Sequence, residues 1–150
     1  MSHFKTTRKG IVTSFSDAER VFLGDVVPFL TELGEVGVDP AATRLNVPVY
    51  LDDPESNDEW WRLMGPELGE ARRTDRQLFQ KVLQTNSYVL TDAEADAVLR
   101  VVNETRLALG VRLGIEVEED HERIPPEDRQ ALDFLGWLQE ELTAELTKRL

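Results

Sequence analysis

The sequence predicts a mainly helical α+β domain, a bundle of about five helices with a small two-stranded β-ribbon. Strand candidates at residues 11–15 and 88–90 supply the ribbon, and each runs directly into a capping box that opens a helix. Apolar residues recur at helical spacing through most of the remaining chain. The chain has 150 residues, 41% of them hydrophobic, which is enough for one core, and no Gly- or Ser-rich linker divides it. We therefore expect a single domain over residues 1–150.

The first helix follows Ser16, whose side chain accepts from the amide of Glu19 while Glu19 reaches back to the amide of Ser16. This helix should end by Gly34. Pro28 lies inside it, removes one internal hydrogen bond and crowds the carbonyl of Gly24. A kink or a split is therefore expected at Pro28.

Residues 35–51 are expected to form a long connection, with a turn of helix around 40–44. Asp53 then provides a cap and Pro54 a first helical residue, so a helix should start there. Gly65-Pro66 should end that helix and start another, which continues to about Gln84.

The second capping box joins Thr91 to Glu94 and opens a helix over residues 92–113. That helix is apolar on more than one face, which predicts a central position or a subunit contact. An acidic loop follows, and the last helix runs from about Glu127 to the C-terminus.

Arg106 lies at the centre of the apolar stripe of the 92–113 helix. A buried guanidinium must be paired, so one interpretation is a structural ion pair. Another places Arg106 at the floor of a pocket, where it receives an anionic ligand, and a third lets it reach solvent along its aliphatic stem. We prefer the first, in which Arg106 and also Arg112 pair with Asp52 or Asp53 and pin the long connection onto the central helix.

Three tryptophans are candidates for surface roles. Trp137 projects away from the apolar stripe of the last helix, so either a second surface covers it, including one from another copy in a homodimer, or it is exposed. The Trp60-Trp61 doublet could form a base-stacking platform, but that role needs interleaved cations. We therefore expect a structural doublet, with Arg62, Arg72, Arg73 and Arg76 on a solvated helix face.

The net charge of −12 is concentrated in two segments. Residues 52–59 hold five acids and no base, and residues 116–128 hold seven acids and Arg123. This balance argues against a nucleic-acid or anionic membrane partner. It suits a basic protein partner or a hard cation. Neither segment has the glycine of a calcium loop, and His121 is alone in its segment, so we predict no metal and no cofactor.

Further function classes are disfavoured by what the sequence lacks. It has no cysteine, which removes thiol chemistry and fits a reducing compartment. The first ten residues carry no apolar run of the kind that a secretory signal needs, so we expect the cytoplasm. No nucleophile elbow, phosphate-binding loop, dinucleotide fingerprint or zinc-protease motif is present.

Three blocks of the sequence resemble an uncharacterised actinobacterial family, a domain of unknown function. The blocks are residues 48–54 (PVYLDDP), 103–115 (NETRLALGVRLGI) and 135–140 (LGWLQE). Their order and spacing cover most of the chain. The sequence departs from the family pattern at Phe134, where a tyrosine is expected, and in a more acidic loop before the last helix.

The resemblance implies no established activity. It implies a gene neighbourhood, since proteins of this family are often encoded beside the ClpS protease adaptor and a JAMM-type metalloprotease. Some relatives carry the label of transcriptional regulators, which the acidic balance here does not support. The site residues that follow by position are Tyr50, Asp52, Asp53, Asn103, Arg106, Arg112 and Trp137.

These observations predict a non-enzymatic interaction or regulatory protein, and the resemblance implies a link to Clp-type proteolysis. The alternative is a small anionic-ligand-binding or metal-dependent enzyme that uses Arg106 in a pocket.

Overall fold

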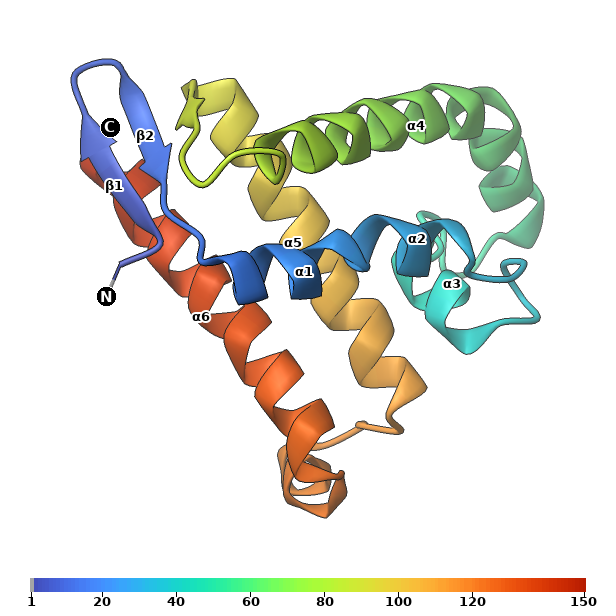
Figure 1. Cartoon of the computed structure of the whole chain (residues 1–150). Coiled ribbons are helices and arrows are strands. Elements are labelled where there is room, and N and C mark those ends of the chain that lie inside the picture. Colours follow the sequence, from blue (N-terminus) through green and yellow to red (C-terminus); the bar gives the residue numbers. More distant parts are fainter. Residues whose placement is uncertain (1) are drawn as a thin grey trace.

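The computed structural model describes residues 2–150 and contains six α-helices, one 3-10 helix and a three-stranded antiparallel sheet (Figure 1). The elements in chain order are β1 (Phe4–Thr7), β2 (Gly10–Thr13), α1 (Asp17–Gly24), α2 (Val26–Thr31), α3 (Pro40–Leu45), α4 (Pro54–Val82), β3 (Val89–Leu90), α5 (Asp92–Arg112), η1 (Glu118–Arg123) and α6 (Pro126–Lys148). The mainly helical class is confirmed. The expected five helices and two strands are corrected to six and three.

The sheet has the order β1-β2-β3, and β2 pairs with β3 as expected, with Ile11 opposite Leu90. Strand β1 was not predicted, and a two-residue turn joins it to β2. Gly10 ends that turn with a φ of 148°, and a Cβ there would come within 2.1 Å of the Leu90 carbonyl oxygen. Only glycine therefore allows β2 and β3 to approach so closely.

The helix expected to end by Gly34 is split into α1 and α2, and the break falls at Asp25 rather than at Pro28. Pro28 has no N–H to donate to the carbonyl of Gly24, so the helical ladder stops there. A new helix then starts at Val26. Pro28 lies in its first turn, where a missing N–H costs nothing.

Helix α4 runs without interruption through Gly65-Pro66, so the prediction that two helices meet there was wrong. Pro66 removes one hydrogen bond and crowds the carbonyl of Arg62, and in Figure 1 the helix bends in this region. The buried residues of α4 are Asp75, Phe79 and Val82, which all lie in its second half.

Helix α5 lies at the centre of the fold, as its apolar faces predicted. It contacts α2, α3, α4 and α6 as well as β2 and β3. Figure 1 shows α5 and α6 side by side in opposite directions, with α1 and α2 crossing in front of α5. Both predicted capping boxes are formed, at Ser16–Glu19 and at Thr91–Glu94. The side chains buried most completely around α5 include Phe79, Val98 and Leu135.

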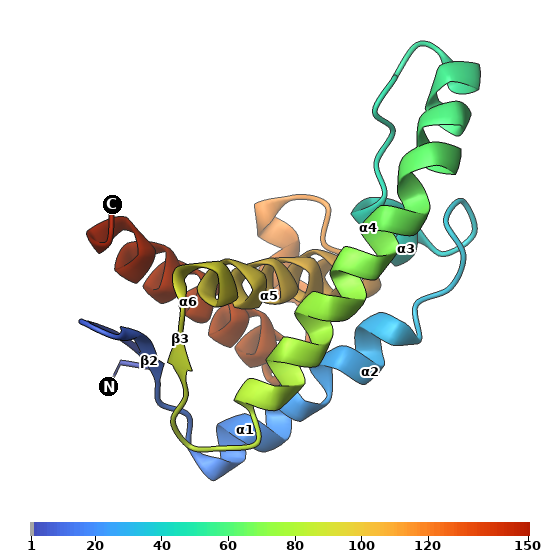
Figure 2. The ribbon, with the colours of Figure 1, turned by 90° about the horizontal axis from the view of Figure 1, so that it is seen from above.

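Two segments lie at the margins of this core. Residues 113–125, with η1, join the end of α5 to the start of α6. Residues 46–66, which we call the arm, comprise the end of the long connection and the first turns of α4. Figure 2 shows the arm extending beyond the rest of the molecule. Among the helices of residues 2–150, none combines the length and apolar character needed to cross a membrane.

Candidate functional site

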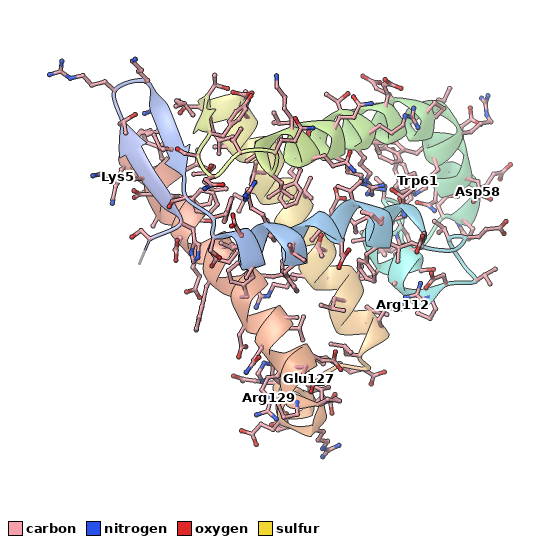
Figure 3. The ribbon with its side chains drawn as sticks, viewed as in Figure 1. Lys5, Asp58, Trp61, Arg112, Glu127 and Arg129 are labelled. Carbon is pink, nitrogen blue, oxygen red and sulfur yellow. The ribbon has the colours of Figure 1, made fainter. Side chains whose placement is uncertain are left out.

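The seven predicted site residues lie in four places. Asn103 and Arg106 lie on α5, facing α6. Arg112 lies at the end of α5 beside α3 (Figure 3). Tyr50, Asp52 and Asp53 belong to the arm. Trp137 lies on α6, and its side chain is 61% exposed.

A short hydrogen-bonded chain joins the second and third blocks of the sequence. Arg106 Nη1 donates to Gln139 Oε1 over 3.1 Å, and Gln139 Nε2 donates to Asn103 Oδ1 over 3.2 Å. The guanidinium lies over Gly136, where a Cβ would be 3.7 Å from Arg106 Nε. Arg106 is exposed and not buried on the stripe, so it needs no ion pair, and its charge remains available.

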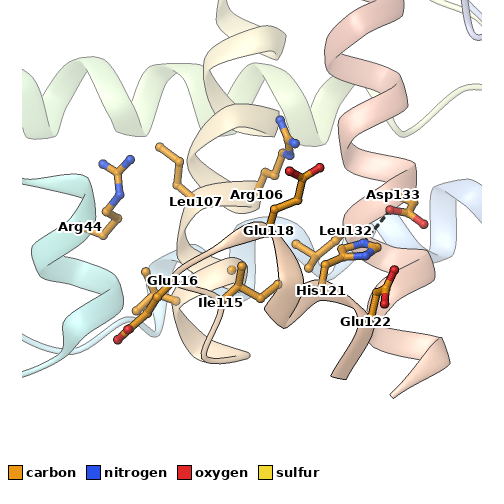
Figure 4. Close-up of a pocket in the computed structure, with 12 residues that line it drawn as sticks. Arg44, Arg106, Leu107, Ile115, Glu116, Glu118, His121, Glu122, Leu132 and Asp133 are labelled. Carbon is orange, nitrogen blue, oxygen red and sulfur yellow. Dashed lines mark hydrogen bonds and ion pairs between the residues drawn. The ribbon is translucent and has the colours of Figure 1, made fainter. Parts of the chain in front are cut away.

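Arg106 also lines a cavity of about 720 Å³ between the end of α5, η1 and the start of α6 (Figure 4). The lining residues are Arg44, Arg106, Leu107, Gly110, Val111, Ile115, Glu116, Glu118, His121, Glu122, Leu132 and Asp133. Figure 4 shows the ends of Arg106 and Glu118 pointing toward each other. Arg106 therefore lines a pocket, as the second interpretation expects, and its side chain is exposed to solvent, as the third expects.

The cavity carries more negative than positive charge. Four carboxylates line it, against two arginines and one histidine. His121 Nε2 lies 2.9 Å from Asp133 Oδ1. The side chains of Glu116, Glu118 and Glu122 form no ion pair or hydrogen bond with any other residue of 2–150. Arg44 and Arg106 also form no ion pair within these residues, so the four carboxylates exceed the two arginines by two charges. This net negative charge favours a cationic occupant.

A second hollow, of about 750 Å³, adjoins the first. The two share Arg44, Val111, Ile115 and Glu116. The remaining lining of the second hollow is mainly small or apolar and comes from the long connection, α3 and the loop after α5: Gly37, Val38, Pro40, Thr43, Val47, Pro48 and Gly114. Together they form one groove, acidic near η1 and apolar near α3, and we call it the α5 groove.

The expected pairing of Arg106 or Arg112 with Asp52 or Asp53 is wrong. Arg112 Nη2 instead donates to Asp39 Oδ2 over 2.6 Å. Asp39 caps α3 by accepting from the amide of Ala41. The same carboxylate accepts from the amide of Gly34 over 2.7 Å. This last bond, aided by Arg112, lowers the pKa of Asp39. The long connection is thus pinned to the central helix, but through a residue that the sequence did not single out.

Asp53 caps α4 instead of pairing with an arginine. Its carboxylate accepts from the Ser56 hydroxyl over 2.7 Å and from the Ser56 amide over 3.0 Å, and these bonds lower the pKa of Asp53. Tyr50 is 48% exposed, and its amide points to the side chain of Asn57. The predicted site residues of the arm therefore take no part in the hydrogen-bonded chain that includes Arg106.

The tryptophan doublet and the nearby arginines have structural contacts. The rings of Trp60 and Trp61 meet edge to face, with centroids 4.9 Å apart, which is no stacking platform. Arg72 donates to the Leu45 carbonyl, and Arg76 pairs with Glu104 on α5 at 3.4 Å. These two arginines bind neighbouring elements, so the solvated face predicted for them is wrong, while Arg73 pairs only with its helical neighbour Glu70.

Sequence reasoning missed Asp39, Arg44 and Ile115 as parts of these contacts, whereas Glu118 belongs to the acidic segment that it had identified. For Asp39 a signal existed, since an aspartate before Pro40 is a typical helix start. The others come together only through the fold. Within residues 2–150, no group of three or more His, Asp or Glu side chains is arranged to hold a metal ion.

A family described as a domain of unknown function, DUF2017, matches residues 1–146. The chain belongs to this family. No curated protein and no solved structure matches it significantly.

Proposed function

We propose that this protein is a non-enzymatic, cytoplasmic interaction protein whose α5 groove binds a basic segment of a partner protein. The observation that carries the proposal is the set of three unpaired carboxylates, Glu116, Glu118 and Glu122, which line a cavity that continues into an apolar hollow. Lysine or arginine side chains complement the first part of the groove. Aliphatic side chains complement the second.

The size of the groove supports a peptide more than a small ligand. Each hollow alone has the volume of a drug-sized site, but both are open and neither encloses its contents. An open groove with an apolar floor and a charged wall is typical of peptide recognition, in which several side chains share the contact.

A displayed library of random peptides tests the proposal without knowledge of the natural partner. Selection on the whole chain should enrich peptides with net positive charge and apolar residues. Affinity for the selected peptides should fall about tenfold in the variant Glu116→Gln/Glu118→Gln/Glu122→Gln, since three partly exposed ion pairs are lost. The affinity should also fall as salt rises.

The matched control removes the same charge elsewhere. Glu32, Glu67 and Glu140 are exposed, line neither hollow and form no ion pair with another residue of 2–150. Their triple change to Gln should leave affinity within about twofold of the wild type. Equal losses in both variants would show only a general charge effect, and selection of no basic peptides would contradict the proposal.

The resemblance described above suggests where the natural partner belongs. Components of Clp-type proteolysis, ClpS first, are the partners to test by pull-down from the native host, with the triple groove variant as the negative control. Binding that survives in that variant would place the partner on another surface.

The second candidate is an enzyme for a small anionic substrate. It is favoured by one observation, that Arg106 lines the same cavity as the His121–Asp133 pair. Arg106 would hold the anion and His121 would transfer a proton. The excess of carboxylates disfavours it. Thermal shift with phosphate and small carboxylates tests it, since stabilisation that Arg106→Met abolishes would support this candidate.

A homodimer through Trp137 is a further proposal. The ring is 61% exposed on α6, and aromatic side chains anchor interfaces. Sedimentation of the wild type and of Trp137→Ala at high concentration tests it, since a wild-type monomer would exclude this dimer.

The label of transcriptional regulator is disfavoured by the charge, because a net −12 repels phosphates.

A further inference from the structure

The arm presents an unusual amount of apolar surface. Of the large hydrophobic side chains that are exposed in residues 2–150, six lie on the arm: Val47, Val49, Tyr50, Leu51, Leu63 and Met64. Leu51 is 81% exposed and Leu63 is 60% exposed. Exposed apolar residues that gather on one projecting segment mark an interaction surface.

The arm is anchored but not covered. The side chain of Asn57 accepts from the amide of Val49 over 2.8 Å, which holds the connection against the first turn of α4. No residue of α4 before Asp75 is buried. Local contacts therefore hold the arm, and the six apolar side chains named above stay exposed.

The arm continues directly from the α5 groove. Val47 and Pro48 line the apolar hollow, and Val49, Tyr50 and Leu51 follow them along the chain. Apolar residues thus follow one another along the chain from the lining of the groove into the arm.

The arm also has its own unpaired acids. Glu59 pairs with Arg62 at 2.5 Å, and Asp53 caps the helix. Asp52, Glu55 and Asp58 form no ion pair or hydrogen bond with other side chains in the described part of the chain. Figure 3 shows Asp58 on the outer side of α4. Three free carboxylates thus stand near each end of the apolar surface, at the arm and in the groove.

From this arrangement we infer that the arm and the α5 groove form one continuous docking surface for a single partner segment, which has an apolar centre and basic residues at both ends. The inference rests on the proposed function and adds the pattern of the partner. A second copy of this chain is a poorer occupant, because two arms would bring like charges together.

The experiment uses a peptide selected on the whole chain, synthesised in two forms with a photocrosslinker at either its N-terminus or its C-terminus. One form should crosslink to residues 46–66 and the other to residues 115–133. Both forms crosslinking only to residues 115–133 would overturn the inference and leave the proposed function intact. The absence of any saturable binding would overturn both.

Substitutions in the arm and in the groove measure separately how much each end of the docking surface contributes to peptide affinity. Asp52→Asn/Glu55→Gln/Asp58→Asn should weaken the peptide about tenfold, as should the triple change in the groove, and Leu51→Ser/Leu63→Ser should weaken it at least as much. All of these side chains are exposed, so melting temperatures should stay near the wild-type value. The control is Val21→Ser, an equally exposed apolar residue on α1.

Affinity that is unchanged in both arm variants would contradict the inference, whatever the groove variant does. Crosslinks between two copies of the chain through residues 46–66 would also overturn it, because they would identify a second copy as the occupant.

Discussion

Arg112 and Asp39 form the ion pair that fixes the long connection to the central helix, with 2.6 Å between Nη2 and Oδ2. Arg112 is half exposed, whereas the side chain of Asp39 is only 10% exposed. The Asp39 carboxylate also accepts hydrogen bonds from two backbone amides. The aspartate therefore organises the contact, and the arginine adds to it. The α5 groove depends on this arrangement, because α3 and residues 37–48 form its apolar wall.

Replacing Asp39 should lower the melting temperature more than replacing Arg112. Asp39→Ala removes a helix cap, the bond to Gly34 and the ion pair, whereas Arg112→Met removes the ion pair alone. Thermal unfolding followed by circular dichroism checks this order. Equal effects of the two changes would show that the ion pair dominates.

His3 should stabilise the attachment of the N-terminal strand. Its Nε2 lies 2.6 Å from Glu19, its Nδ1 lies 3.2 Å from Glu141, and its ring stacks on Phe15. His3→Ala should lower the free energy of unfolding by about 1–2 kcal/mol, as measured by urea denaturation. His121→Ala is the control, since His121 has one carboxylate partner and is more exposed. An equally large loss of unfolding free energy in the control would contradict the stabilising role of His3.

Acid should remove the contribution of Glu19. Burial of its carboxyl raises the pKa, but hydrogen bonds from Ser16 and His3 outweigh this effect, so the pKa of Glu19 lies below its ordinary 4.5. A carboxyl with a lowered pKa stabilises the fold above the pKa of the unfolded chain, and this stabilisation is lost as pH falls through the folded value. The stability difference between wild type and Glu19→Gln should therefore persist at pH 7 and shrink below about pH 4.5. A difference that grew on acidification would contradict the lowered pKa.

The ion pair between α4 and α5 should contribute more than the ion pairs on the surface. Arg100 donates to both oxygens of Asp75, at 2.8 and 2.9 Å, and Asp75 is only 8% exposed. Arg100→Met should cost about 1–2 kcal/mol, less than for a fully buried pair because Arg100 is half exposed. Arg73→Met, which breaks the exposed pair with Glu70, should cost below about 0.5 kcal/mol by the same denaturation measurement. Similar costs for both would indicate that Asp75 is well hydrated.

The turn between β1 and β2 should require glycine. Gly10→Ala should destabilise the chain by at least about 2 kcal/mol, because the new Cβ would meet the Leu90 carbonyl. Gly69→Ala inside α4 meets only ordinary contacts and should stabilise by about 0.5–1 kcal/mol. Denaturation of both variants tests the contrast, and a neutral Gly10→Ala would contradict the close approach.

Local chemistry explains what could be predicted. Ser16 and Thr91 cap their helices through hydrogen bonds to residues three positions away, so four consecutive residues contain the whole interaction. The pairing of β2 with β3 followed from their apolar character, and the position of Trp137 away from the apolar stripe of α6 followed from helical periodicity.

Contacts between distant segments explain the errors. Strand β1 has one large apolar residue, Phe4, and is held by tertiary bonds such as that from the Thr6 amide to Glu145. Pro66 signals a helix end in isolation, yet the second half of α4 packs on α5 and the helix continues with a bend. No local rule linked Arg112 to Asp39, seventy-three residues away.

The candidate site, like the fold, could be predicted only in part. The acidity of residues 116–128 was visible in the sequence, but the cavity that it lines was not. That cavity exists because the antiparallel packing of α5 and α6 brings Arg106, His121 and Asp133 together.

Amide chemical shifts of the isotopically labelled whole chain, recorded while a selected basic peptide is added, test the central claim most directly. Binding in the α5 groove predicts that the largest changes fall in residues 37–48 and 106–122 and at the start of α6, around Asp133, and that they weaken in the variant Glu116→Gln/Glu118→Gln/Glu122→Gln. Changes concentrated instead on β1, β2 and the C-terminal half of α6 would contradict it.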